Sequence, residues 1–142
     1  MNVTISFPRN QQPDIDKAKI AKRLCQAASL YIDLPDNITI EFVDLGHGTY
    51  GESTLHFNNK NKIRINIQLS NKELIYPLVH ELLHLNQIHK GKLAVTRFGD
   101  CVWEGKTYKI DQSKLLYQEY KQLPWELDVA HREKELLAKI LK

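Results

Sequence analysis

The feature that most constrains the fold is the segment from Leu78 to Lys90, which would be apolar on almost every side of a helix. Its apolar residues are Leu78, Val79, Leu82, Leu83, Leu85 and Ile88. A helix without a polar face must be covered by other elements, so we expect it in the middle of a domain. Either the capping-box pattern Ser70-Asn71-Lys72-Glu73 or Pro77 as a first helical residue begins the helix, and Gly91 ends it.

The remaining segments show strand and helix patterns in turn. Alternating apolar residues predict strands at Val3–Phe7, Ile38–Phe42, Leu55–Phe57 and Ile63–Leu69, and a hairpin at Val102–Ile110 around Glu104-Gly105. Helices are predicted from the N-cap Asp14 to about Ile32, near Lys114–Gln122, and from Pro124 to the C-terminus. This order predicts an α+β fold with a small, mostly antiparallel sheet packed on helices. Because the chain has no repeat and no linker-like stretch, residues 1–142 are predicted to form a single domain.

Composition and charge favour an ordinary globular protein. Hydrophobic residues make up 42% of the 142 residues and charged residues 26%. The net charge of +3 is spread along the chain, and Glu133 and Glu135 interrupt the basic stretch Arg132–Lys142, so nucleic-acid binding is not expected. Cys25 and Cys101 form no paired motif and are predicted to be buried, reduced thiols. Without a signal-peptide pattern or an apolar run of spanning length, a cytoplasmic protein with no membrane contact is expected.

The central helix carries the motif His80-Glu81-Leu82-Leu83-His84. Histidines four residues apart project from one helix face, so both imidazoles can reach one cation. Two imidazole nitrogens suit zinc. Glu81 is placed to accept a proton from a water at the metal as that water attacks a carbonyl. Burying these groups without a partner would cost several kcal/mol, so the motif predicts a Zn²⁺ site with Glu81 as catalytic base.

A catalytic zinc site needs a third protein ligand. On the predicted last helix, Trp125 and Val129 form an apolar stripe with Leu136 and Ile140, and Glu126 falls within this apolar sector. A carboxylate that points into the core suggests metal ligation, so Glu126 is the predicted third ligand. Asp128 is the next candidate, followed by one of the remaining histidines, which are His47, His56, His89 and His131. Glu133 shares the face of Glu126 and is either a partner that orients a ligand imidazole or a solvated residue.

The stretches Val79–Leu85 and Pro124-Trp125-Glu126 resemble the gluzincin branch of zinc peptidases, and more narrowly the small minigluzincin type found in phages and bacteria. This resemblance covers about residues 37–142. It implies a zincin-like fold in which the predicted strand Ile63–Leu69 is the edge strand of the cleft and a C-terminal helix supplies the third ligand. The chain departs from the family at Ala130, where an acidic residue or asparagine would orient a ligand histidine. Glu133, Asp128 or a backbone carbonyl would have to replace it.

The resemblance also implies an activity, the hydrolysis of peptide bonds in a peptide or protein substrate. Glu81 would be the base and then the acid toward the leaving amine, while zinc polarises the scissile carbonyl. Candidates for stabilising the oxyanion are His131, Tyr117 and Tyr120.

Three further readings stay open from the sequence. One is a non-catalytic zinc-binding accessory protein on the same scaffold. In the second, the N-terminal segment Met1–Gln12 lies over the cleft and inhibits the enzyme. In the third, the loop Gly46–Gly51 is either a mobile lid or a plain turn.

Overall fold

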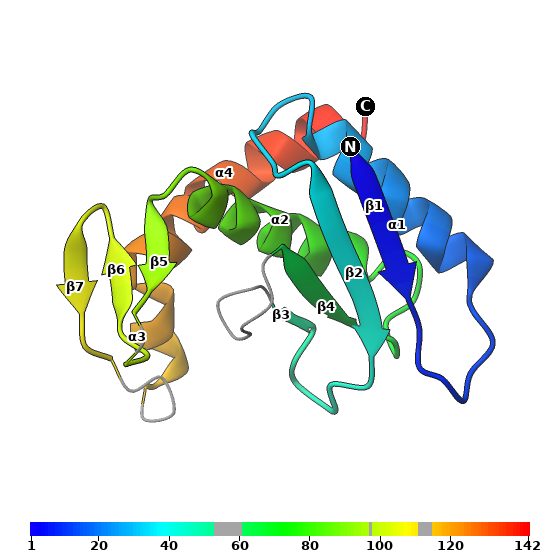
Figure 1. The fold of residues 1–142 in the computed structure, drawn as a ribbon, viewed down its shortest axis with the longest axis horizontal. Helices are drawn as coiled ribbons and strands as arrows, with labels where there is room; N and C mark the ends of the chain where they lie inside the picture. Colours follow the sequence, from blue (N-terminus) through cyan, green and yellow to red (C-terminus); the bar gives the residue numbers. More distant parts are fainter. Residues whose placement is uncertain (53–60, 97, 111–114) are drawn as a thin grey trace.

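The structure is a computed structural model that describes residues 1–52, 61–96, 98–110 and 115–142. Its elements are β1 (Asn2–Ser6), α1 (Ile15–Ala28), β2 (Asn37–Val43), β3 (Gly51–Glu52), β4 (Lys62–Asn66), α2 (Ile75–His89), β5 (Leu93–Val95), β6 (Cys101–Trp103), β7 (Lys106–Tyr108), α3 (Tyr117–Lys121) and α4 (Pro124–Ile140). Figure 1 shows the larger sheet on one side of α2 and the small β5–β6–β7 sheet beyond its C-terminal end. The predicted α+β class is confirmed.

The larger sheet corrects two predictions. Its strand order is β1-β2-β4-β3, and β1, β2 and β4 run parallel, so this sheet is mixed rather than mostly antiparallel. The reason is that α1 returns the chain between β1 and β2, and such a crossover makes neighbouring strands parallel. The predicted strand Ile63–Leu69 corresponds to β4, which is an interior strand. The edge belongs to β3, which pairs antiparallel with β4.

Helix α2 occupies the middle of the fold, as its apolar sequence predicted (Figure 1). Leu78, Leu82 and Leu85 pack into the core that α1 and the larger sheet form. Val79 and Leu83 contact Val129 and Leu136 of α4, on the other side of the helix. The apolar residues of α2 are therefore buried on both of these sides of the helix. A narrow strip between the two sides carries the His80–His84 motif.

Local sequence features explain where α2 begins and where it ends. The Ser70 amide donates to the Glu73 carboxylate (3.0 Å), and the Glu73 amide donates to the Ser70 hydroxyl (3.2 Å), as a capping box requires. These bonds close a turn, and the regular helix begins after it at Ile75, so Pro77 lies in the first turn, where its missing N–H breaks no helical bond. At the other end Gly91 adopts a φ of 75°, the left-handed conformation that stops a helix.

The other predicted elements are found with shifted ends. Helix α1 is capped by Asp14 but ends at Ala28 rather than near Ile32, and the hairpin of β6 and β7 turns at Glu104-Gly105 as predicted. Strand β5, which pairs with β6, was not predicted. The predicted strand Leu55–Phe57 lies outside the described residues. Cys25 and Cys101 are both buried, as expected. Among the described helices, none is both long enough and apolar enough to span a bilayer.

The N-terminal segment does not cover the centre of the molecule. Strand β1 pairs with β2 at the sheet edge opposite β3, and residues 7–13 lead from β1 directly into α1 (Figure 1). The motif of α2 faces the β3 side, where Gly51 approaches Glu81. The reading of Met1–Gln12 as an inhibitory cover is therefore wrong for this conformation of the chain.

Candidate metal centre

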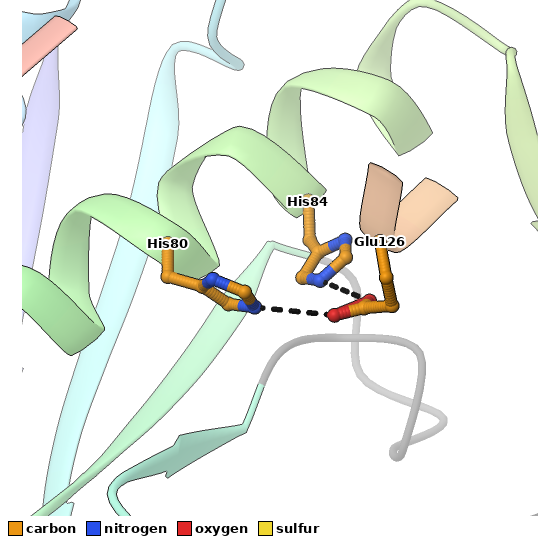
Figure 2. Close-up of side chains that lie close together, drawn as sticks. All are labelled: His80, His84 and Glu126. Carbon is orange, nitrogen blue, oxygen red and sulfur yellow. Dashed lines mark ion pairs between the residues drawn. The ribbon is translucent and has the colours of Figure 1, made fainter. Parts of the chain in front are cut away.

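Three side chains from two helices converge beside β3. His80 and His84 project from successive turns of α2, and Glu126 projects toward them from the first turn of α4 (Figure 2). The Nε2 atom of His84 lies 2.7 Å from Glu126 Oε2, and the Nε2 atom of His80 lies 3.3 Å from Glu126 Oε1. One ligand atom from each residue lies within 4.8 Å of the other two. The sequence-predicted set His80, His84 and Glu126 is thus brought together.

The start of α4 fixes the position of Glu126. Leu123 is the N-cap and Pro124 the first helical residue, a position where proline fits because its N–H would be unpaired anyway. Trp125 is buried in a cluster with Leu93 and Leu123, and Tyr108 of the β6–β7 hairpin packs edge-on against its ring at 5.6 Å. This anchored tryptophan holds the next residue, Glu126, over α2.

Each candidate histidine ligand has a second partner on its other ring nitrogen. The Nδ1 atom of His80 contacts a carboxylate oxygen of Glu133, and the hydroxyl of Tyr76 donates to the other oxygen of that carboxylate (2.5 Å). The Nδ1 atom of His84 lies 2.8 Å from Oε1 of Gln87. Oxygen acceptors on Nδ1 fix the imidazole tautomer that leaves Nε2 free for a cation.

The pKa shifts of His80, His84 and Glu126 show which charge the site favours. Burial disfavours charged His80, but hydrogen bonds with Glu126 and Glu133 outweigh it and raise its pKa to about 10. For His84, burial is likewise outweighed, by a hydrogen bond with Glu126 and by the nearby Glu81 carboxylate, and its pKa is raised. Burial also disfavours ionised Glu126, but hydrogen bonds with the two imidazoles lower its pKa to about 2. The buried carboxylates therefore favour a positive charge between Glu126 and the two imidazoles.

A bound cation would supply this positive charge. With Nδ1 of both imidazoles bonded to oxygen, Nε2 of each ring faces the Glu126 carboxylate. The raised pKa values mean that protons on the imidazoles supply the positive charge when no metal is bound, and a metal ion can replace the protons on Nε2. Ligand atoms at zinc distances of about 2.0–2.2 Å stand roughly 3.4 Å apart in a tetrahedron. The 3.3 Å between His80 Nε2 and Glu126 Oε1 is near this spacing, while His84 Nε2 and Glu126 Oε2 are closer, at 2.7 Å. The donor set fits a metal ion.

Asp128 does not face this group. Its carboxylate accepts a hydrogen bond from Gln87 Nε2 (2.8 Å) and pairs with Arg132 (3.1 Å) on its own helix. Within the described part of the chain, His80, His84 and Glu126 are the only such metal-ligand group. His47, His89 and His131 do not belong to it, and His56 lies outside the described residues. Asp128, His47, His89 and His131 are therefore not supported as ligands.

Glu81 is buried next to the group without joining it. It is 6% exposed, and its charge contributes to the raised pKa values of His80, His84 and Tyr120. A Cβ atom on Gly51 would lie 3.3 Å from Glu81 Cγ and 3.0 Å from Ile65 Cδ1. The absence of a side chain at Gly51 lets the edge strand β3 approach the Glu81 side chain closely.

We expect the substitution Gly51→Ala to displace Glu81 and to destabilise the fold by about 1–3 kcal/mol, as overpacking of a filled site does. Urea unfolding measures the loss. In the double variant Gly51→Ala/Ile65→Val the closest clashing atom is absent, so stability should be partly restored while the contact with Glu81 persists. Equal stability of wild type and Gly51→Ala would show that the space at β3 is not limiting.

The three oxyanion candidates lie in different surroundings. Tyr120 is half-buried; burial, the charges of Glu126 and Glu81 and a hydrogen bond with Glu126 raise its pKa. Tyr117 is 70% exposed and packs under the Lys121 ammonium group, and His131 is exposed on α4. Of these three candidates, Tyr120 is the one whose polar group lies at the candidate site, where its hydroxyl bonds with Glu126.

The loop before β3 is tied to the body of the protein. The side-chain amide of Asn66, which is 4% exposed, donates to the carbonyls of Gly46 (2.8 Å) and Thr49 (3.0 Å). The Asn66 backbone amide also donates to the Tyr50 carbonyl (2.9 Å). These bonds favour the plain turn over the mobile lid for Gly46–Gly51.

Sequence reasoning missed Gln87 and left the partner of the His80 ring open. Glu133 proves to be that partner, while Gln87 serves His84. The available signal for Gln87 was a polar residue in an apolar helix, three positions after a candidate ligand. No protein-family model, no curated protein and no solved structure matches this chain.

Proposed function

We propose that the chain is a zinc-dependent peptidase with a zincin-like fold, in which His80, His84 and Glu126 hold Zn²⁺ and Glu81 is the general base. The observation that carries the proposal is the convergence of two oriented imidazoles and one buried carboxylate beside a second buried carboxylate that is not a ligand candidate. Two histidines and one glutamate with a fourth position open form a donor set of catalytic zinc sites. Nitrogen ligands argue against magnesium and calcium, which prefer oxygen.

Each chain residue then has a role in hydrolysis. Zinc, when bound, supplies a Lewis acid that polarises a substrate carbonyl and lowers the pKa of water. Glu81 accepts the proton of the attacking water and passes it to the leaving amine. Glu133 and Gln87 hold the two imidazoles in the tautomer that ligation needs.

The resemblance to gluzincins supports the same assignment, since a glutamate on a helix after the motif lies beside both histidines. Strand β3 offers an edge beside which a peptide substrate could bind. It is an edge strand whose Gly51 lies against Glu81, so an extended peptide beside β3 would pass the proposed base.

Metal content together with peptide hydrolysis tests the proposal. We expect one zinc per chain by mass spectrometry, cleavage of a mixture of unstructured peptides, loss of cleavage after chelation, and recovery on adding zinc. Zinc without cleavage of any peptide in the mixture would favour a non-catalytic zinc-binding protein on this scaffold. A protein that takes up no zinc on reconstitution would refute the metal site itself.

The substitution Tyr120→Phe should reduce kcat by about 100-fold with little change in KM, because an oxyanion donor acts mainly in the transition state. Zinc affinity is measured as well and kcat is compared at saturating zinc, because the hydroxyl also forms a hydrogen bond with Glu126. Tyr117→Phe is the matched control, because its exposed hydroxyl lies away from the ligand candidates. Equal kcat values for the two variants would exclude Tyr120 as the donor.

A further inference from the structure

Gln87 is a fully buried amide with a defined bond for each of its polar atoms. It is 0% exposed and lies on α2, three residues after His84. Its Nε2 atom donates to the backbone carbonyl of Trp125 (2.9 Å) and to the carboxylate of Asp128 (2.8 Å). Its Oε1 atom lies 2.8 Å from Nδ1 of His84. A buried amide with every group satisfied has one orientation.

That orientation determines the tautomer of His84. Both groups facing Nε2 are acceptors, so the amide nitrogen must point toward them and the amide oxygen toward the imidazole. A carbonyl oxygen only accepts, and His84 Nδ1 must therefore carry the hydrogen. The lone pair of neutral His84 is consequently on Nε2, the atom 2.7 Å from Glu126.

The same amide links the two helices that carry the ligand candidates. The carbonyl that accepts from Gln87 belongs to Trp125, the residue directly before Glu126. Asp128, the other acceptor, is on α4 as well and is held by Arg132, which in turn donates to Asn86 on α2 (3.0 Å). One side chain thus sets the His84 ring and fixes the start of α4 relative to α2.

From this arrangement we propose that Gln87 is a positioning residue that presents His84 Nε2 and the Glu126 carboxylate to the same metal ion, with Asp128 as its anchor. The proposal rests on the proposed function, because it assigns a role at that metal site. Ala130 is exposed and has no group that could orient a histidine. Glu133 contacts His80 instead, and Gln87, bonded to Asp128 on the next helix, contacts His84.

Zinc affinity of the purified full chain, measured by competition with a chromophoric chelator, tests the proposal. Gln87→Met keeps the approximate volume and removes all three hydrogen bonds, and we expect zinc affinity to fall about 10- to 100-fold, the loss typical of residues that orient a ligand. The visible absorption of the cobalt-loaded variant should change as well, because the His84 ring is no longer fixed.

A reversal of the amide and carboxylate separates orientation from packing. In Gln87→Glu two carboxylates face each other, and we expect a larger loss of affinity. In Gln87→Glu/Asp128→Asn the new carboxylate still accepts from His84 Nδ1, while the new amide donates back to it. The double variant should therefore regain most of the lost affinity, although the Trp125 carbonyl lacks its donor.

Asn66→Leu is the matched control. Asn66 is also a buried amide with three hydrogen bonds: its Nδ2 atom donates to the carbonyls of Gly46 and Thr49, and its Oδ1 atom accepts from the Gln68 amide. None of these residues is a ligand candidate. We expect this variant to lose stability and to keep its zinc affinity. Wild-type affinity in Gln87→Met, or equal losses in Gln87→Met and Asn66→Leu, would overturn the positioning role and leave the proposed function standing. Absence of zinc binding in the wild type would instead overturn the proposed function and this role with it.

Discussion

Replacement of Glu126 by alanine should remove zinc from the protein. The carboxylate approaches both Nε2 atoms and is the only acidic member of the ligand group, so its loss leaves two nitrogens to hold the ion. We expect zinc affinity to fall by more than about 100-fold, the upper range for the loss of an outer-shell partner. His84→Ala should have an effect of the same size, since that ring is buried and aligned with Glu126.

Two measurements check this result. The first is the zinc-to-protein ratio after gel filtration of reconstituted protein. The second is thermal unfolding with and without zinc, because an ion that binds only the folded chain stabilises it by about 2.7 kcal/mol at 100 times Kd. Zinc should raise the melting temperature of the wild type and leave that of Glu126→Ala nearly unchanged.

Glu135→Ala is the matched control for Glu126→Ala. Glu135 is a second glutamate on α4, but it is exposed and pairs with Lys139. This variant should bind zinc as the wild type does. One zinc per chain in Glu126→Ala together with none in His84→Ala would show that the third ligand is another residue.

The second large effect is expected for Glu81→Gln, which should still bind zinc. Its rate of peptide hydrolysis should fall by about 100- to 10,000-fold, the usual contribution of a general base. The amide has nearly the same shape as the carboxylate but cannot accept the proton. Because Glu81 is buried and close to both imidazoles without belonging to the ligand group, the substitution should leave the ligand geometry in place.

Steady-state kinetics on a peptide that the wild type cleaves, together with zinc content, measure this effect. Glu119→Gln is a suitable control, because Glu119 is an exposed glutamate of α3 that caps its own helix. Undiminished hydrolysis by zinc-loaded Glu81→Gln would disprove the assignment of the base. Loss of zinc in this variant would show that Glu81 supports the metal rather than the proton transfer.

The central helix and its histidine pair were predictable because they depend on local periodicity. Residues that cover a helix all round must be buried, and residues four apart must share a face, whatever surrounds them. The same argument located Glu126, since a carboxylate within an apolar sector of α4 points at the helix packed against it, whereas it left Glu133 open between a partner of a ligand imidazole and a solvated residue. Both are buried against the histidines of α2.

Strand direction and edge position were not predictable in this way. Alternation in Ile38–Phe42 and Ile63–Leu69 predicts which residues face the helices, and the alternating apolar residues that lie within β2 and β4 are buried. It does not state the direction or the order of the neighbouring strands, because these depend on the connections between strands. Helix α1 returns the chain so that β1 and β2 are parallel, and β3 pairs with the outer side of β4, so the sheet is mixed and the expected edge strand is an interior strand.

The α+β class, the central place of α2 and the three side chains of the candidate metal centre could thus be predicted, because each follows from the residue pattern of single helices and strands. The contacts between elements became known from the packed fold: Gln87 and Asp128 behind His84, Gly51 against Glu81, and Tyr120 rather than Tyr117 at the site. These contacts join residues from different elements, and their existence depends on how the helices and the sheet pack together, which no local periodicity encodes.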